Sequence, residues 1–288
     1  MRRFAVIDVG SNSVRLMLVA DGKVLYKRLN TTRLGEGLAQ APLLKEAAIE
    51  RTATAIADFY AQAKADGAEK VFAFATAAAR SALNKQVLID RVKSLCGLQL
   101  EVISGEAEAE IGLLGALGNK DGAIIDIGGA STEIVVKEKG EILYKKSVDI
   151  GVVRLKDACG RDIEALKRRS LQEMQNFGQI PNHLPFYGIG GTATTLAAQY
   201  LGLSEYQSNK ITGAVLPIEG IEDLVERFAL LPLEEIAKLP CMPKGREDVI
   251  LGGAIWLSIL LNGLKIKEII VSDRDNLEGY AIKRGLME

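Results

Sequence analysis

The sequence has few of the residues on which several classes of protein depend. Only three of its 288 residues are cysteines, and Cys96, Cys159 and Cys241 lie far apart without CxxC spacing. An odd number of scattered cysteines argues against a disulfide framework and provides no zinc motif. His183 is the only histidine and lies between two prolines in a predicted loop, which excludes a multi-histidine metal site and disfavours a Ser-His-Asp triad.

A strong excess of charge and long apolar runs are also absent. The net charge of −1 gives no general attraction to nucleic acid or to an anionic membrane, so we expect neither as a partner. Asp8, Asn12 and Arg15 interrupt the N-terminal apolar run too early for a signal peptide, and no stretch reaches the roughly 18 uninterrupted apolar residues of a membrane helix. These features predict a cytoplasmic protein.

What the sequence does contain is a repeated segment. "AVIDVGSNSVRLMLVADGKVLYKR" at residues 5–28 aligns without a gap with "AIIDIGGASTEIVVKEKGEILYKK" at residues 123–146. A repeat this long indicates a duplicated domain and not a solenoid. The chain length suits two domains, which we place at residues 1–118 and 119–288.

Apolar periodicity predicts a similar order of elements in both halves. In the first half we expect strands at 4–9, 14–20, 23–29, 70–75 and 98–103, and helices at 43–64, at 78–95 and from Ser104. In the second half we expect strands at 123–127, 132–137, 142–149, 184–189 and 268–272, helices within 152–177, from Thr192, at 218–230 and 248–261, and a terminal helix.

Fully apolar strands such as "AIIDI" need cover on both faces, so the sequence predicts two α/β domains with a cleft between them. The terminal helix belongs to the second domain in sequence, and packing of this helix on the first domain is an alternative. The apolar segment "ILGGAIWLSILL" fits either a core helix or the interface of a homodimer.

Each copy of the repeat carries an aspartate at the end of a strand, Asp8 or Asp126, with a glycine two residues later. Backbone N–H groups of such a glycine turn can contact phosphate oxygens. Asp-x-Gly also occurs in ordinary hairpins, but two copies facing each other across a cleft favour a binding site. The phosphate-binding candidates that follow are Gly10, Ser11, Asn12 and Ser13 in the first copy and Gly128, Gly129 and Ser131 in the second.

Arg15 and Glu133 occupy the same position in the two copies. One wall of the cleft would then offer a cation for phosphate and the other a carboxylate, although a solvated strand face remains an alternative for Arg15. A carboxylate about 4 Å from a phosphate charge is repelled by roughly 4 kcal/mol at an effective dielectric constant of about 20. We therefore expect a divalent cation held by Asp8, Asp126 and Glu133, and an oxygen-only ligand set favours Mg²⁺ or Mn²⁺.

Three further segments offer candidate site residues. In "ISGEAEAEIG", Ser104 can cap a helix whose acidic residues Glu106, Glu108 and Glu110 suit the helix dipole, and only one of them is expected to face the cleft. In "YGIGGTATTLAA", Gly190, Gly191 and Thr192 form a strand-to-helix turn that can bind phosphate. In "ATAAARSALN", Arg80 is either a phosphate ligand or a surface arginine.

Together these segments resemble the Ppx/GppA phosphatases, a family of exopolyphosphatases and guanosine pentaphosphate phosphohydrolases. The resemblance covers essentially the whole chain through "IDVGSNSVRLML", "ATAAARSALN", "VISGEAEAEIG", "IDIGGASTEIVV", "YGIGGTATTLAA", "REDVILGGAIWL" and "VSDRDNLEGYA". It implies duplicated actin/hexokinase/Hsp70-like (ribonuclease H-like) domains with an interdomain cleft. The larger members carry an additional helical region, so the resemblance is to the short two-domain form.

The resemblance also implies site roles. Glu108 corresponds to the glutamate that activates water, and Asp126 and Glu133 to residues that position metal and phosphate, while Arg80 corresponds to the anion-binding arginine. Ala107 and Ala130 depart from the family motifs, where a glutamate and a glycine are usual.

The implied activity is hydrolysis of the terminal phosphoanhydride of inorganic polyphosphate by an exopolyphosphatase. The alternative is removal of the 5′ terminal phosphate of guanosine pentaphosphate (pppGpp). A kinase of the same fold and a nucleotide-dependent scaffold protein are more distant alternatives. The sequence gives no chain-length preference and no oligomeric state.

Overall fold

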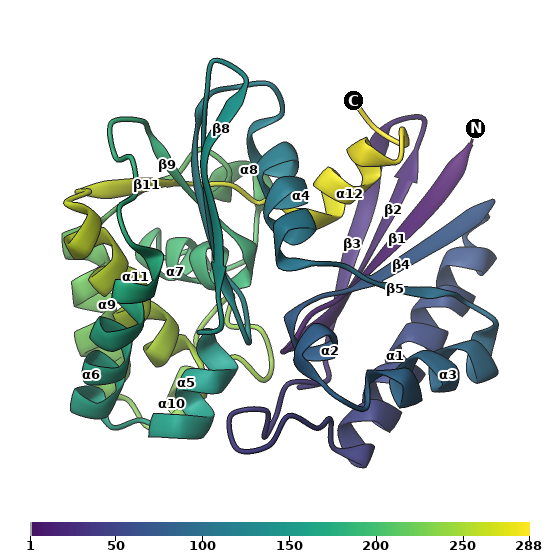
Figure 1. Ribbon diagram of the computed structural model, residues 1–288, viewed down its shortest axis with the longest axis horizontal. Helices are drawn as coiled ribbons and strands as arrows, with labels where there is room; N and C mark the ends of the chain where they lie inside the picture. Colours follow the sequence, from purple (N-terminus) through teal and green to yellow (C-terminus); the bar gives the residue numbers. More distant parts are fainter. Residues whose placement is uncertain (1) are drawn as a thin grey trace.

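The computed structural model describes residues 2–288, which form two mixed β-sheets with a pair of helices between them (Figure 1). The first sheet has the strand order β3-β2-β1-β4-β5. Its strands are β1 (Arg3–Val9), β2 (Ser13–Ala20), β3 (Lys23–Thr31), β4 (Lys70–Ala75) and β5 (Leu100–Val102).

The second sheet repeats this arrangement in the order β10-β11-β9-β6-β7-β8. Its strands are β6 (Gly122–Ile127), β7 (Thr132–Glu138), β8 (Glu141–Val148), β9 (Phe186–Ile189), β10 (Val215–Pro217) and β11 (Glu268–Val271). Read from its β8 edge, the order β8-β7-β6-β9-β11 corresponds to β3-β2-β1-β4-β5 of the first sheet. The predicted duplicated α/β fold is therefore confirmed, and β10 is an added edge strand that the sequence analysis missed.

The helices of the first half are α1 (Glu46–Ala65), α2 (Ala77–Ser81), α3 (Lys85–Cys96) and α4 (Gly105–Leu117). Those of the second half are α5 (Val152–Cys159), α6 (Ile163–Met174), the short 3₁₀ helix η1 (Gln175–Phe177), α7 (Gly190–Tyr200), α8 (Ser208–Ile211), α9 (Ile218–Leu230), α10 (Leu233–Ile236), α11 (Ile250–Leu264) and α12 (Asn276–Lys283). No helix among residues 2–288 combines the length and hydropathy needed to cross a membrane.

The strands are buried on both faces, as their apolar runs predict. In β1, Ile7 joins the core that sheet one forms with α1 and α3, whereas Val6 joins a separate core on the opposite face. In β6, Ile125 faces the large core around α11, and Ile124 faces α4. Alternate residues of one strand thus face two helical layers, as the two-residue repeat of a strand requires.

The two central helices are exchanged between the sheets. Helix α4 follows β5 of sheet one, yet it contacts β6, β7 and β8 of sheet two. Helix α12 follows β11 of sheet two, yet it contributes Leu277, Tyr280 and Ala281 to the core beneath sheet one. The two helices lie side by side in the middle of the molecule (Figure 1).

Two predictions about helices need correction or refinement. The single helix predicted at 78–95 is two helices, because Ala82 is extended and Asn84 uses its side chain on the backbone of Leu44, accepting at 2.8 Å and donating at 2.9 Å. Helix α7 begins at Gly190, two residues before the predicted start. The apolar segment within α11 is buried in the core, so it does not form an exposed interface.

Candidate active site

The two copies of the repeat build the same turn at the same place on their sheets. Asp8 lies opposite Arg15 in the β1–β2 register, and Asp126 lies opposite Glu133 in the β6–β7 register. In each turn a glycine N–H donates 3.0 Å to a serine carbonyl, from Gly10 to Ser13 and from Gly128 to Ser131.

The two turns also meet across the cleft. Gly129 lies so close to the first turn that a Cβ on it would come within 2.7 Å of the Cβ of Ser11. The duplicated loops are therefore opposed, and a larger residue at 129 would push them apart.

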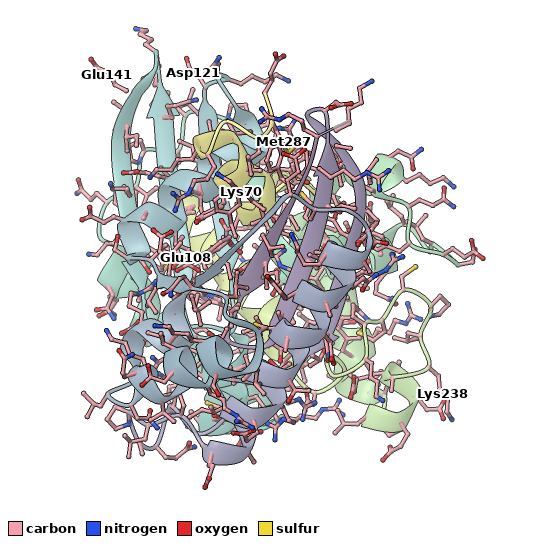
Figure 2. The ribbon with its side chains drawn as sticks, turned by 90° about the vertical axis from the view of Figure 1, so that its right-hand side faces the viewer. Lys70, Glu108, Asp121, Glu141, Lys238 and Met287 are labelled. Carbon is pink, nitrogen blue, oxygen red and sulfur yellow. The ribbon has the colours of Figure 1, made fainter. Side chains whose placement is uncertain are left out.

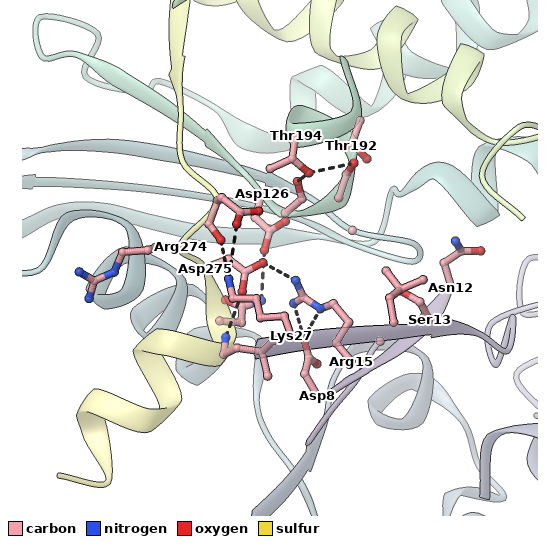
Figure 3. Close-up of a pocket in the computed structure, with 18 of the residues that line it drawn as sticks. Asp8, Asn12, Ser13, Arg15, Lys27, Asp126, Thr192, Thr194, Arg274 and Asp275 are labelled. Carbon is pink, nitrogen blue, oxygen red and sulfur yellow. Dashed lines mark hydrogen bonds and ion pairs between the residues drawn. The ribbon is translucent and has the colours of Figure 1, made fainter. Parts of the chain in front are cut away.

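A cavity of about 800 Å³ opens between the two halves, and most of the predicted site residues line it (Figure 3). The lining residues that the sequence singled out are Asp8, Gly10, Ser11, Asn12, Ser13, Arg15, Glu108, Asp126, Gly128, Gly129, Ser131, Gly190, Gly191 and Thr192. Arg80 and Glu133 are the two predicted residues that do not line it.

Glu108 is the glutamate of its segment that faces the cavity. Ser104 caps α4 by accepting a hydrogen bond from the N–H of Ala107 at 3.1 Å, which places Glu108 in the first turn at 6% exposure. Glu106 and Glu110 point outward, with 80% and 42% of their side chains exposed. Figure 2 shows Glu108 in the middle of the molecule, whereas Asp121 and Glu141 lie at one end.

Arg80 lies behind Glu108 and not in the cavity. Its Nη1 donates to Oε2 of Glu108 at 2.7 Å and to the carbonyl of Ile103 at 3.3 Å. Burial raises the pKa of Glu108, and Arg80 opposes that rise. Arg80 as placed here therefore controls the charge of Glu108, and contact with a phosphate would require it to move.

Glu133 is buried behind the cavity lining at 1% exposure, opposite Asp126 in the β6–β7 register. Its Oε1 accepts a hydrogen bond from Ser147 at 2.6 Å, and its Oε2 is buried without a partner among residues 2–288. Burial, together with the charges of Glu108 and Asp126, raises its pKa well above the usual range.

Arg15 is already engaged by two carboxylates. It forms ion pairs with Asp8 and with Asp275, the N-cap residue of α12 (Figure 3). The solvated strand face that was the alternative for Arg15 is therefore not observed. Arg15 joins the first sheet to the start of α12 while still lining the cavity.

The start of α7 forms a third side of the cavity. Gly190 has a φ of +74°, and a Cβ on it would overlap Oδ1 of Asp126, so only glycine suits this position. Thr192 donates from Oγ1 to the carbonyl of Ile127 at 2.9 Å, which joins α7 to the end of β6. Since the first N–H groups of a helix lack partners within it, this end suits a phosphate.

Several polar residues that line the cavity were missed by the sequence analysis, among them Lys27, Arg246, Asp275 and Asn276. Arg246 is 8% exposed, and no carboxylate among residues 2–288 lies within ion-pair distance of it. Burial, followed by the charge of Arg15, lowers its pKa to about 10. A buried cation that lacks a protein anion is a candidate anion site. Arg246 lies in "REDVILGG", Asp275 and Asn276 lie in "VSDRDNLEGYA", and Lys27 lies in the repeated segment, but no local pattern marks them as site residues.

The donor set fits a divalent cation, although Asp8, Asp126 and Glu133 do not form a ready three-carboxylate site. No group of three or more His, Cys, Asp or Glu side chains suited to a metal occurs in residues 2–288. Mg²⁺ commonly uses only one or two carboxylates together with water and substrate phosphate. Oδ1 of Asp8 is buried without a partner among these residues, and burial, with Asp275 and Glu108, raises the pKa of Asp126 to about 7. A cation would relieve this uncompensated charge.

Opposed acidic strand ends and glycine turns at a cavity between two duplicated α/β halves define a class of site whose chemistry suits phosphate. The family model described as "Ppx/GppA phosphatase family" matches residues 18–285. The chain therefore belongs to the Ppx/GppA phosphatase family. Phosphatases of this family generally depend on a divalent metal.

Individual relatives agree with this assignment. The chain is 31% identical to exopolyphosphatase 2 of Mycobacterium tuberculosis, over 98% of both chains. It is 28% identical to a guanosine-5′-triphosphate,3′-diphosphate pyrophosphatase of Vibrio vulnificus, over 98% of this chain and 58% of that one. The crystal structure of the Aquifex aeolicus Ppx/GppA family member superposes with a TM-score of 0.79 at 29% identity, covering 99% of this chain and 98% of that one.

Proposed function

We propose that this protein is an exopolyphosphatase, which hydrolyses the terminal phosphoanhydride of inorganic polyphosphate and releases orthophosphate. The observation that carries this proposal is the buried Glu108 carboxylate, which faces a cavity walled by both glycine turns. Support also comes from the full-length similarity to a relative named exopolyphosphatase 2.

Glu108 is the general base in this proposal. Its carboxylate takes a proton from a water molecule as the water oxygen attacks the terminal phosphorus, and the shortened polyphosphate leaves with the bridging oxygen. Burial makes Glu108 more basic than an exposed glutamate by raising its pKa, while the ion pair with Arg80 acts in the opposite direction and favours the carboxylate. General base catalysis of this kind contributes about 10²–10⁴ in rate.

The remaining acceleration comes from positioning and charge. Backbone N–H groups of the turns at Gly10–Ser13 and Gly128–Ser131 and of the start of α7 would hold phosphate oxygens. Arg246 adds positive charge at the cavity wall, whereas the charge of Arg15 is shared with Asp8 and Asp275. Because these groups are fixed by the fold, they need little rearrangement as charge develops.

Asp8 and Asp126 are the residues that would hold a Mg²⁺ or Mn²⁺ ion, with Glu133 supporting them from behind the cavity lining. When bound, such an ion neutralises phosphate charge and lets an anionic chain approach the carboxylates. Asp8 and Asp126 come from the two duplicated halves, so both halves contribute to the site.

The second candidate activity is removal of the 5′ terminal phosphate of pppGpp. The relative from Vibrio vulnificus favours it, since it carries that type of name and matches 98% of this chain. The bond broken is again a terminal phosphoanhydride, so the same residues would serve. The two activities differ only in what occupies the cavity beyond the terminal phosphates.

The test is phosphate release from polyphosphates of several lengths, from pppGpp and from ATP, each with Mg²⁺, with Mn²⁺ and with a chelator. We expect the highest kcat/KM on polyphosphate and loss of activity with the chelator. A higher kcat/KM on pppGpp would replace the first proposal by the second. Phosphate appearing on an added acceptor instead of in water would contradict both.

Glu108→Gln tests the base. We expect phosphate release to fall by about 10² or more with unchanged folding, because the amide cannot accept the proton. Glu106→Gln is the matched control, since Glu106 lies on the same helix turn with 80% of its side chain exposed. Wild-type activity in Glu108→Gln would show that another group is the base.

A further inference from the structure

We infer that Asn276, at the start of α12, is a positioning residue that fixes the carboxylate of Asp126 against the first half of the molecule. The inference rests on the proposed function, in which Asp126 contacts the metal and phosphate. Asn276 touches neither the substrate nor any reacting atom in this scheme and acts through Asp126.

The direct contact is a buried hydrogen bond. Nδ2 of Asn276 donates to Oδ2 of Asp126 at 3.1 Å, across 150 positions of sequence. Asn276 is 5% exposed, and its Oδ1 is buried without a partner among the described residues. Leaving an amide oxygen unpaired is unfavourable. This orientation of the amide is explained if its nitrogen is needed to donate to the Asp126 carboxylate. Rotating the amide by 180° would place its oxygen against that carboxylate instead.

The residue before Asn276 reaches the other aspartate. Asp275 forms an ion pair with Arg15, and Arg15 also pairs with Asp8 (Figure 3). Consecutive residues of one helix turn are thus linked to both strand-end aspartates, directly to Asp126 and through Arg15 to Asp8. The first turn of α12 therefore sets how the two carboxylates stand relative to each other.

That turn is itself held rigidly on sheet one. Asp275 and Glu278 form a capping box, in which each side chain accepts a hydrogen bond from the helix backbone. Lys27 of β3 binds Glu278 at 2.7 Å and donates to the carbonyl of Asp273 at 2.7 Å. A support fixed at several points can orient a carboxylate, which a mobile one cannot.

The hydrogen bond also leaves one oxygen of Asp126 available. Because Asn276 occupies Oδ2, the other oxygen, Oδ1, faces the backbone of Gly190 at the start of α7. The amide thus selects which oxygen points toward the phosphate-binding end of that helix. Loss of the amide would free the carboxylate to rotate.

The test compares Asn276→Leu, which keeps the side-chain shape but has no donor, with Tyr280→Phe. Tyr280 lies one turn further along α12, and its hydroxyl donates to Glu101 at 2.8 Å. Tyr280→Phe removes this hydrogen bond and the one that the hydroxyl accepts from Arg284 at 2.7 Å, both of them away from Asp126. Binding of Mn²⁺ alone is followed by electron paramagnetic resonance, and kcat and KM for polyphosphate are measured separately.

We expect Asn276→Leu to weaken Mn²⁺ binding by about 10-fold and to lower kcat by about 10- to 100-fold, as losses of residues that orient metal ligands typically do. KM should change less than kcat, and Tyr280→Phe should leave Mn²⁺ affinity unchanged. If Asn276→Leu does not fold, Asn276→Ala is measured in its place, because the smaller alanine side chain cannot clash with its neighbours.

Wild-type Mn²⁺ affinity and kcat in a folded Asn276 variant would overturn the inference. Failure of both variants to fold would also overturn it, because Asn276 would then serve the stability of the fold. Mn²⁺ binding is measured without substrate, so a wild-type protein that binds Mn²⁺ but releases no phosphate would count against the proposed function and not against Asn276.

Discussion

Arg246 is a buried guanidinium that lines the cavity next to Gly191, where a Cβ would overlap it. Its charge costs folding free energy, because burial is not compensated by a carboxylate among residues 2–288. A bound anion would compensate the charge of Arg246, so we infer that this guanidinium contacts an anionic ligand.

We therefore predict that Arg246→Met raises the KM for polyphosphate by about 10-fold or more, the equivalent of about 1.4 kcal/mol of lost binding. The same variant should unfold at the same urea concentration as the wild type or at a higher one. Steady-state kinetics and urea unfolding measure the two effects. Lower stability with an unchanged KM would assign Arg246 to the fold.

Arg80 gives a prediction on pH dependence. Burial raises the pKa of Glu108 and Arg80 lowers it, so removal of Arg80 leaves the carboxyl with a still higher pKa. Glu108 acts in its deprotonated form, and activity rises as pH rises through its pKa. Arg80→Met should therefore move the acidic limb of kcat/KM to higher pH. A profile between pH 5 and 9 that keeps its wild-type limb would show that Arg80 does not tune Glu108.

Residues with local signals were the ones that sequence analysis could find. Asp8 and Asp126 follow apolar strands and precede glycines, and the spacing of two among the glutamates around Glu108 already allowed only one of them to face the cleft. Asn276 and Arg246 gave no such signal, since their partners lie more than 50 positions away in the sequence. A contact of that kind exists only after the chain has folded.

Among the elements, α4 and α12 approach each other unusually closely. A Cβ on Gly279 would overlap the carbonyl of Ile111, and one on Gly115 would overlap the carbonyl of Asp275. The two glycines thus let backbone meet backbone at the point where the halves join.

Gly279→Ala should therefore destabilise the protein by about 1–3 kcal/mol or more, because the methyl group has no room. Gly252→Ala is the matched control. It also lies in a helix, but its Cβ would meet Leu166 at an ordinary 3.4 Å, and alanine favours helix. Urea unfolding of both variants measures the difference. Equal stability of the two would mean that α4 and α12 can separate at little cost.

The strands and most helices followed from apolar periodicity, and the duplicated hairpin fixed which strands correspond. The break between α2 and α3 could not be predicted from periodicity. It depends on hydrogen bonds between the side chain of Asn84 and the backbone of Leu44, 40 positions away. The exchange of α4 and α12 between the sheets has no local signal in the sequence either.

At the scale of the whole molecule, the crowded carboxylates link stability to pH. Folding raises the pKa of Asp126 from 3.8 to about 7, so the folded state holds this proton more tightly than the unfolded state. The metal-free protein should therefore lose stability from this group as pH rises through that interval. At about 1.4 kcal/mol per pKa unit, the loss is at most about 4 kcal/mol.

Asp126→Asn removes this ionisation. With a chelator present, we predict that the variant is more stable than the wild type at pH 8 and that the gap shrinks toward pH 4, while phosphate release is lost. Urea unfolding at several pH values measures the gap, and Asp58→Asn, at an exposed position of α1, is the control. A gap that does not depend on pH would contradict the raised pKa.

The exchange of helices also bears on the order in which the molecule assembles during synthesis. The first sheet is complete once residue 102 has been made, but the cover of the face that carries Val6, Met17 and Phe74 includes Leu277, Tyr280 and Ala281 of α12 as well as Ile111 of α4. Nascent chains add residues at about 5–20 per second, so this apolar face lacks the side chains of α12 for roughly ten to thirty seconds after its strands have been made. A fragment that ends near residue 118 should therefore aggregate and depend on chaperones. It should become soluble only when α12 is supplied.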